Sequence, residues 1–136
     1  QPVHHMHLRV TFNEDFTITA AQAAYDAAPY NEHCYSIAPD YGDLVGMNLL
    51  RGFRHAVKAR FGRTAGCTHM TEMSYVLPMV AVQSMAGRRR KVETSPEAQK
   101  KKPFQLVGCH ALRLDSPMTK KFHPEWYIEP EKGSDS

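Results

Sequence analysis

The chain has 136 residues, of which 42% are hydrophobic and 23% are charged, values that exclude a disordered or collagen-like chain and fit one globular domain over residues 1–136. No apolar run approaches the roughly 18 residues of a membrane-spanning helix, and no secretory signal opens the sequence. Three cysteines cannot form a fully paired disulfide framework, so we expect a cytoplasmic protein with free thiols or metal-ligating cysteines.

The net charge of +3 is concentrated in one basic segment. Residues 88–102 hold seven lysines and arginines against two glutamates, so the rest of the chain is slightly negative. Gly87, Pro96 and Pro103 interrupt or flank this segment, and it is almost free of apolar residues, which predicts an exposed, mobile loop over about 87–103. No aromatic residue interleaves the charges to stack on bases, so we expect a small molecule or a protein as partner rather than a nucleic acid.

Alternation at the start of the chain predicts a β-hairpin over about residues 3–20. Apolar residues recur at every second position on both sides of a polar turn at residues 13–15, the pattern of half-buried strands. The apolar face consists of Met6, Leu8, Val10, Phe12, Phe16 and Ile18. Residues 20–28 are ambiguous, because their alanine-rich composition favours a helix.

The middle of the chain is predicted to be helical. One or two turns are expected at residues 40–45, a clearer helix at 52–61 that Gly62 ends, and a third helix over about 68–85 that Pro78 kinks or splits. Residues 104–114 alternate weakly, as in a strand, and the tail at 117–126 reads as irregular. We therefore expect an α+β fold, in which a small antiparallel sheet packs against two or three helices. The hairpin should contact Phe53, Val57, Phe61, Val76 and Val80.

Cysteines and histidines gather in four short segments: His4, His5 and His7; His33 and Cys34; Cys67 and His69; Cys109 and His110. Cys67 opens the third predicted helix, where free N–H groups and the helix dipole stabilise a thiolate. His69 can converge with it, and Glu72, one turn further on, can orient the imidazole. His5 and His7 share one strand face and could hold a metal together, although a plain polar strand face is the simpler interpretation. His4 points to the other face.

Three interpretations of these residues remain open. In the first, Cys34, Cys67, His69 and either Cys109 or His110 hold a zinc or iron ion. In the second, Cys67 is a nucleophile assisted by His69 and Glu72. In the third, the cysteines are small buried side chains of a non-enzymatic binding or assembly module. The chain contains neither of two Gly-rich motifs that bind phosphate groups, G-x-x-x-x-G-K-[ST] and G-x-G-x-x-G, so no bound nucleotide is expected.

Several segments resemble a known bacterial family, domain of unknown function 2889, over about Val3 to Tyr127. They are Pro29-Tyr30, Cys34, Ile37-Ala38-Pro39, Tyr41, Leu44-Val45-Gly46, Gly52-Phe53-Arg54, Val57, Gly66-Cys67-Thr68-His69-Met70-Thr71-Glu72, Cys109-His110-Ala111-Leu112-Arg113 and Pro124-Glu125-Trp126-Tyr127. The resemblance implies a bacterial protein and brings no established activity. Members usually have Asp after the first histidine, where this chain has His5, so no carboxylate role is carried over to that position. Members also usually carry a preceding segment that looks like a further strand, which this sequence does not show, and we therefore expect the chain to be a fragment.

The order of elements also resembles, more loosely, iron–sulfur scaffold proteins of the NifU and IscU type. A hairpin, a loop cysteine and a helix-opening cysteine follow one another, so Cys34 and Cys67 would take two of the scaffold's ligand positions. The scaffold's middle cysteine has no counterpart between them, and Cys109 or His110 would have to replace it. This likeness is at the level of the fold, and a fold does not specify a function.

Overall fold

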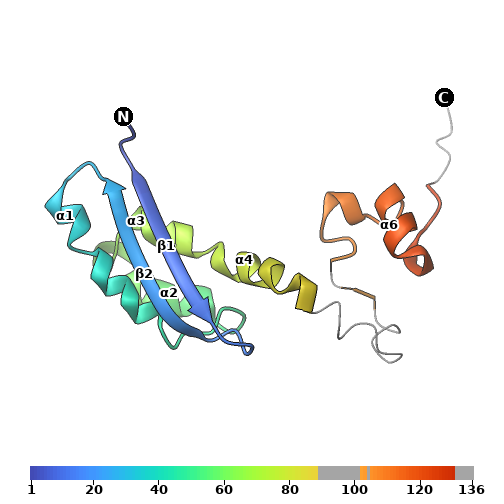
Figure 1. Cartoon of the computed structure of the whole chain (residues 1–136), viewed down its shortest axis with the longest axis horizontal. Coiled ribbons are helices and arrows are strands. Elements are labelled where there is room, and N and C mark those ends of the chain that lie inside the picture. Colours follow the sequence, from blue (N-terminus) through green and yellow to red (C-terminus); the bar gives the residue numbers. More distant parts are fainter. Residues whose placement is uncertain (89–101, 104, 131–136) are drawn as a thin grey trace. The chain divides into compact units, whose positions relative to one another are not determined.

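The computed structural model describes residues 1–88, 102–103 and 105–130, and it divides the chain into two compact units, Gln1–Ala86 and Gly87–Ser136, each described here by itself (Figure 1). Most of the predicted basic loop, residues 89–101, lies outside the described residues. Within the described ranges, no helix is both long and apolar enough to span a bilayer. The prediction of a single domain stays a prediction.

Unit 1 begins with the predicted hairpin. Strand β1 (His5–Phe12) pairs with β2 (Ile18–Ala27) in a two-stranded antiparallel sheet. The side chain of Asn13 holds the turn, because its Oδ1 accepts hydrogen bonds from the N–H groups of Asp15 and Thr17, both at 3.0 Å. The helical reading of the alanine-rich segment 20–28 is wrong, since pairing with β1 outweighs the weak helix propensity of alanine.

Helices follow the hairpin and cover one of its faces (Figure 1). They are α1 (Glu32–Tyr35), the 3-10 helix η1 (Ala38–Leu44), α2 (Phe53–Phe61), the 3-10 turn η2 (Arg63–Ala65), α3 (Thr68–Ser74) and α4 (Leu77–Ser84). The predicted helix over 68–85 is split between α3 and α4, with Pro78 in the first turn of α4, where a missing N–H costs nothing. The fold is α+β, as predicted.

The hairpin and the helices bury one apolar core. Its fully or nearly buried members are Phe16, Ile18, Tyr41, Leu44, Leu49, Phe53, Val57, Phe61, Met70 and Ala81. The ring of Tyr41 stacks on that of Phe61 with 4.4 Å between their centroids. Met6, Leu8, Val10 and Phe12 pack against this core from the inner face of β1, which confirms the predicted face of the hairpin.

Val76 and Val80, which were predicted to contact the hairpin, are not part of the buried core, although Val80 lines a groove beside Leu8 and Val10 of β1. Val76 and Val80 are 55% and 54% exposed, whereas Ala81 is buried and Leu77 and Met85 pack against the core. Six of the eight residues of this helix are apolar, so hydrophobicity alone does not select the side that faces inward.

Unit 2 contains short helical elements in its described part. They are the 3-10 turn η4 (His110–Leu112), α6 (Pro117–Phe122) and the 3-10 turn η5 (Pro124–Trp126). The described residues of the predicted strand 104–114 form turns and η4, so that prediction is wrong. The tail is also more regular than predicted, because Ser116 caps α6 by accepting the N–H of Thr119 at 3.0 Å.

Candidate functional site

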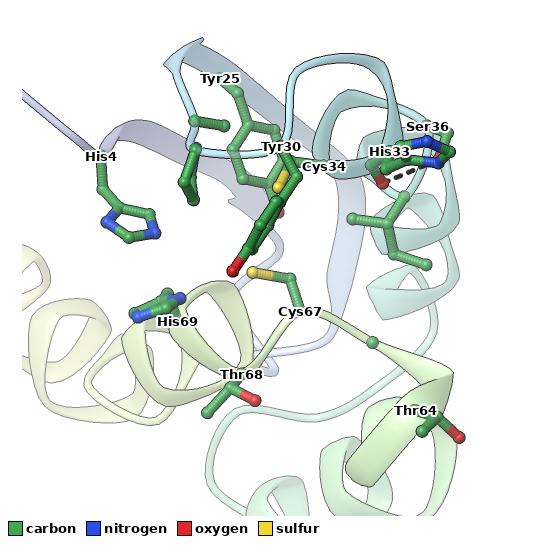
Figure 2. A pocket seen from close by; sticks show the side chains of 14 residues that line it. His4, Tyr25, Tyr30, His33, Cys34, Ser36, Thr64, Cys67, Thr68 and His69 are labelled. Carbon is green, nitrogen blue, oxygen red and sulfur yellow. Dashed lines mark hydrogen bonds between the residues drawn. The ribbon is translucent and has the colours of Figure 1, made fainter.

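Unit 1 has a pocket of about 580 Å³ beside the open end of the hairpin (Figure 2). Four stretches of chain form its walls: His4 before β1, Tyr25 and Ala28 at the end of β2, the region of α1, and residues 64–69 leading into α3. Residues far apart in the sequence therefore meet at one cavity.

Cys67 lies at the N-terminal boundary of α3, as predicted, and its backbone is held by the buried Tyr41. The Tyr41 hydroxyl accepts the Cys67 N–H and donates to the Cys67 carbonyl, both at 3.0 Å, and it lies 2.8 Å from the Thr71 hydroxyl. Burial raises the pKa of Tyr41, so the phenol stays protonated and keeps these bonds. The position of Cys67 is thus fixed from the core.

Gly66 is required at this point because there is no space for a side chain. A Cβ atom there would lie 2.5 Å from the carbonyl oxygen of Phe61 and 3.0 Å from the hydroxyl of Tyr41. The chain can pass close to the core only with glycine before Cys67. Packing therefore requires glycine at position 66, immediately before the cysteine that lines the pocket.

Tyr25 supplies a buried hydroxyl that has no hydrogen-bond partner within the described residues. Burial is the main cause that raises the pKa of Tyr25 far above its ordinary value, and the neighbouring Cys67 thiol adds to the rise. The neutral phenol lies beside the Cys67 sulfur without a well-formed hydrogen bond. A buried polar group of this kind calls for a partner, which a bound ligand can provide.

Histidine and cysteine side chains converge on the pocket. His4, His33, Cys34, Cys67 and His69 all line it. The rings of His4 and His69 lie 4.2 Å apart between centroids. Figure 2 shows the Cys67 sulfur directed into the pocket, with the Cys34 sulfur on the facing wall. Both cysteines are half-buried and free.

The structure brings together three of the predicted metal ligands: Cys34, Cys67 and His69 line the same pocket. Glu72 is exposed, and no hydrogen bond or ion pair joins it to His69 among the described residues. Its role stays a prediction.

Cys109 and His110 are exposed residues of unit 2, where the Arg113 guanidinium lies 3.5 Å from the His110 ring nitrogen. Because the two units are described separately, the part of Cys109 or His110 in the site also stays a prediction.

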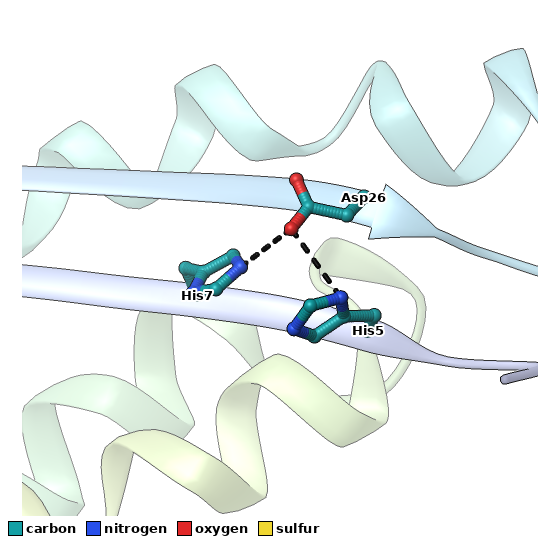
Figure 3. A group of neighbouring side chains, drawn as sticks. All are labelled: His5, His7 and Asp26. Carbon is teal, nitrogen blue, oxygen red and sulfur yellow. Dashed lines mark hydrogen bonds and ion pairs between the residues drawn. The ribbon is translucent and has the colours of Figure 1, made fainter.

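A second cluster lies on the exposed face of the hairpin (Figure 3). The Oδ2 atom of Asp26 is 2.7 Å from Nε2 of His7 and 3.4 Å from Nδ1 of His5. The hydrogen bond from His7, together with the charges of His7 and His5, lowers the pKa of Asp26. Among the described residues, this is the one group of three His, Cys, Asp or Glu side chains whose ligand atoms all lie within 4.8 Å of one another.

Sequence reasoning missed Tyr25 and Asp26 for one reason. Both lie in the alanine-rich segment whose structure the sequence left ambiguous, and only the pairing of β2 with β1 assigns them to a face. His4 was correctly placed on the opposite strand face from His5 and His7, but the sequence gave no sign that a pocket lies there.

Comparisons with known proteins give one match. A family model described as "Protein of unknown function (DUF2889)" matches residues 1–83. No curated protein and no solved structure matches the chain significantly, so the likeness to iron–sulfur scaffolds has no further support. The matched range contains every residue that lines the pocket, whereas Cys109 and His110 lie beyond it.

Proposed function

The chain belongs to the DUF2889 family, and we propose that the pocket around Cys67 is a Cys/His centre that binds a zinc or iron ion. The observation that carries this proposal is the convergence of thiol and imidazole side chains from three separate stretches of the chain on one pocket. Thiolate and imidazole are the ligands that zinc and iron prefer in proteins.

Cys34, Cys67 and His69 are the proposed ligands. The backbone clamp from Tyr41 fixes the Cys67 Cα, which reduces the entropy lost when its sulfur binds an ion. The ligand atoms of the three residues do not lie within 4.8 Å of one another as described, so binding requires rotation of side chains. His69 is exposed, and its ring contacts that of His4. His4 beside it, or Cys109 or His110 from unit 2, would supply a fourth ligand.

The first test is elemental analysis of the untagged chain purified without oxygen. We expect about one zinc or iron ion per chain, because three or four such ligands bind these ions tightly. Cys67→Ser should lose the ion, and His55→Gln, which changes an exposed histidine of α2, should retain it.

Absence of metal from the parent chain, or equal metal in the parent and Cys67→Ser, would contradict the proposal. The double variant Cys109→Ser/His110→Gln decides the source of the fourth ligand. A metal content as low as that of Cys67→Ser would assign the ligand to unit 2, and an unchanged content would assign all ligands to unit 1.

A second candidate function, thiol chemistry at Cys67, is favoured by the unpartnered hydroxyl of Tyr25. This neutral phenol lies beside the Cys67 sulfur and can donate a hydrogen bond to a thiolate or to a ligand oxygen. His69 lies in the same pocket and can act as base, so the pocket holds the parts of an activated nucleophile.

Alkylation with iodoacetamide at neutral pH tests this candidate. We expect Cys67 to react faster than Cys109, although Cys109 is the more exposed thiol, because His69 and the Tyr25 hydroxyl lie in the same pocket and can assist the reacting sulfur. Mass spectrometry of peptides over a time course gives the alkylation rates of Cys34, Cys67 and Cys109 separately. Slower labelling of Cys67 than of Cys109 would remove the candidate.

A further inference from the structure

We propose that His5, His7 and Asp26 form a second metal site, which binds a first-row divalent cation such as Zn²⁺ on the exposed face of the hairpin. This site goes beyond the proposed function, because it shares no residue with the pocket around Cys67.

The backbone of the hairpin builds this cluster. His5 pairs with Ala27 and Met6 pairs with Tyr25, so Asp26 is an extra residue of β2 that has no partner in β1. Such a bulge turns the side chain of the extra residue and increases the local twist. Asp26 therefore reaches across the strand pair toward the two histidines of β1, which project from the same face two positions apart.

The geometry fits a cation held by two imidazoles and one carboxylate. The Asp26 oxygen already contacts a ring nitrogen of each histidine, and the two rings lie 4.7 Å apart between centroids (Figure 3). A cation with bonds of about 2.0–2.2 Å to all three atoms needs only small rotations of these side chains. All three side chains are about half exposed, which leaves them free to adjust.

The donor set also indicates the class of ion. Imidazole nitrogens select Zn²⁺, Fe²⁺ and their neighbours over Mg²⁺ and Ca²⁺, which prefer oxygen ligands. Three protein ligands leave coordination positions open to water, as in catalytic rather than structural zinc sites. The exposed position of the cluster lets a dissolved substrate reach such a water.

The two sites face opposite sides of the same ribbon. His4 and Tyr25 line the pocket, whereas their sequence neighbours His5 and Asp26 belong to the exposed cluster. This alternation allows each site to be removed by substitution without touching the other. An ion bound at one face is therefore distinguishable from an ion bound at the other.

The experiment is calorimetric titration of the full chain with Zn²⁺ in a Cys67→Ser background, so that binding by the pocket is removed. We expect one remaining site, which His5→Gln/His7→Gln and Asp26→Asn each weaken by about tenfold or more. The matched control His55→Gln removes an exposed histidine of α2 and should leave the affinity unchanged. Circular dichroism confirms that each variant is folded.

The outcomes separate this proposal from that for the pocket. No Zn²⁺ binding in the Cys67→Ser background, or binding that the three cluster substitutions leave unchanged, would overturn the second site whatever the metal content of the parent chain. Binding that needs His5, His7 and Asp26, together with equal metal content in the parent chain and in Cys67→Ser, would support the second site and contradict the first.

Discussion

Two tyrosine hydroxyls flank Cys67 and differ in their hydrogen bonding. Tyr41 bonds to both backbone groups of Cys67, whereas the hydroxyl of Tyr25 is buried without a partner among the described residues. A buried donor that is satisfied stabilises the fold, and one that is not satisfied is a cost. Tyr41 therefore serves stability, and Tyr25 is free to serve a ligand.

Replacing each tyrosine by phenylalanine tests this difference. Tyr41→Phe keeps the stacking on Phe61 but leaves the Cys67 N–H without an acceptor, so we expect the free energy of unfolding to fall by about 1–3 kcal/mol. Tyr25→Phe removes an unpartnered hydroxyl and should change the free energy by less than about 1 kcal/mol in either direction. Urea denaturation of both variants measures the two values.

A larger loss of stability from Tyr25→Phe than from Tyr41→Phe would contradict these roles. The pair is well matched, because both substitutions remove one oxygen atom from the same region of unit 1 and leave an aromatic ring in place.

At the scale of elements, local signals predicted part of the fold. Strict alternation predicted β1 and its buried face, and the apolar spacing of Phe53, Val57 and Phe61 predicted α2. Cys67 was placed correctly at a helix start, because Gly66 immediately before it marks a helix boundary in the sequence. These features depend on neighbours within a few residues.

The elements that were predicted wrongly depend on distant contacts. An alanine-rich strand has no strong propensity of its own, so β2 is defined by its partner β1 rather than by its composition. The core against which α4 packs determines which face of the helix is buried, since six of its eight residues are apolar. Tyr25 and Asp26 could not be assigned to sites for the same reason, because their faces follow from register.

At the scale of the whole molecule, the family match and the first compact unit nearly coincide. The match covers residues 1–83 and unit 1 covers 1–86, and every residue of the pocket and of the histidine cluster lies within both ranges. Unit 1 therefore contains every residue that lines the pocket and all three residues of the histidine cluster.

Exchange of residues 88–102 for a Gly/Ser linker of equal length tests the independence of unit 1. We expect the rate of Cys67 alkylation to stay within about twofold of the parent, because the thiol's surroundings set its reactivity and the residues that line its pocket precede the exchanged segment. Most of that segment lies outside the described residues. If the chain is instead a binding or assembly module that acts through this basic segment, the exchanged chain should lose a co-purifying partner. A large change in Cys67 labelling would contradict the independence of unit 1.

The bulge at Asp26 has a genetic consequence. Side chains of residues that are adjacent in the sequence lie on opposite faces of the hairpin, and the extra residue of β2 determines on which face each one lies. A point mutation can therefore alter one site and spare the other. Loss or gain of a single codon in β2 would move the residues beyond it to the wrong face and disrupt both sites in one event.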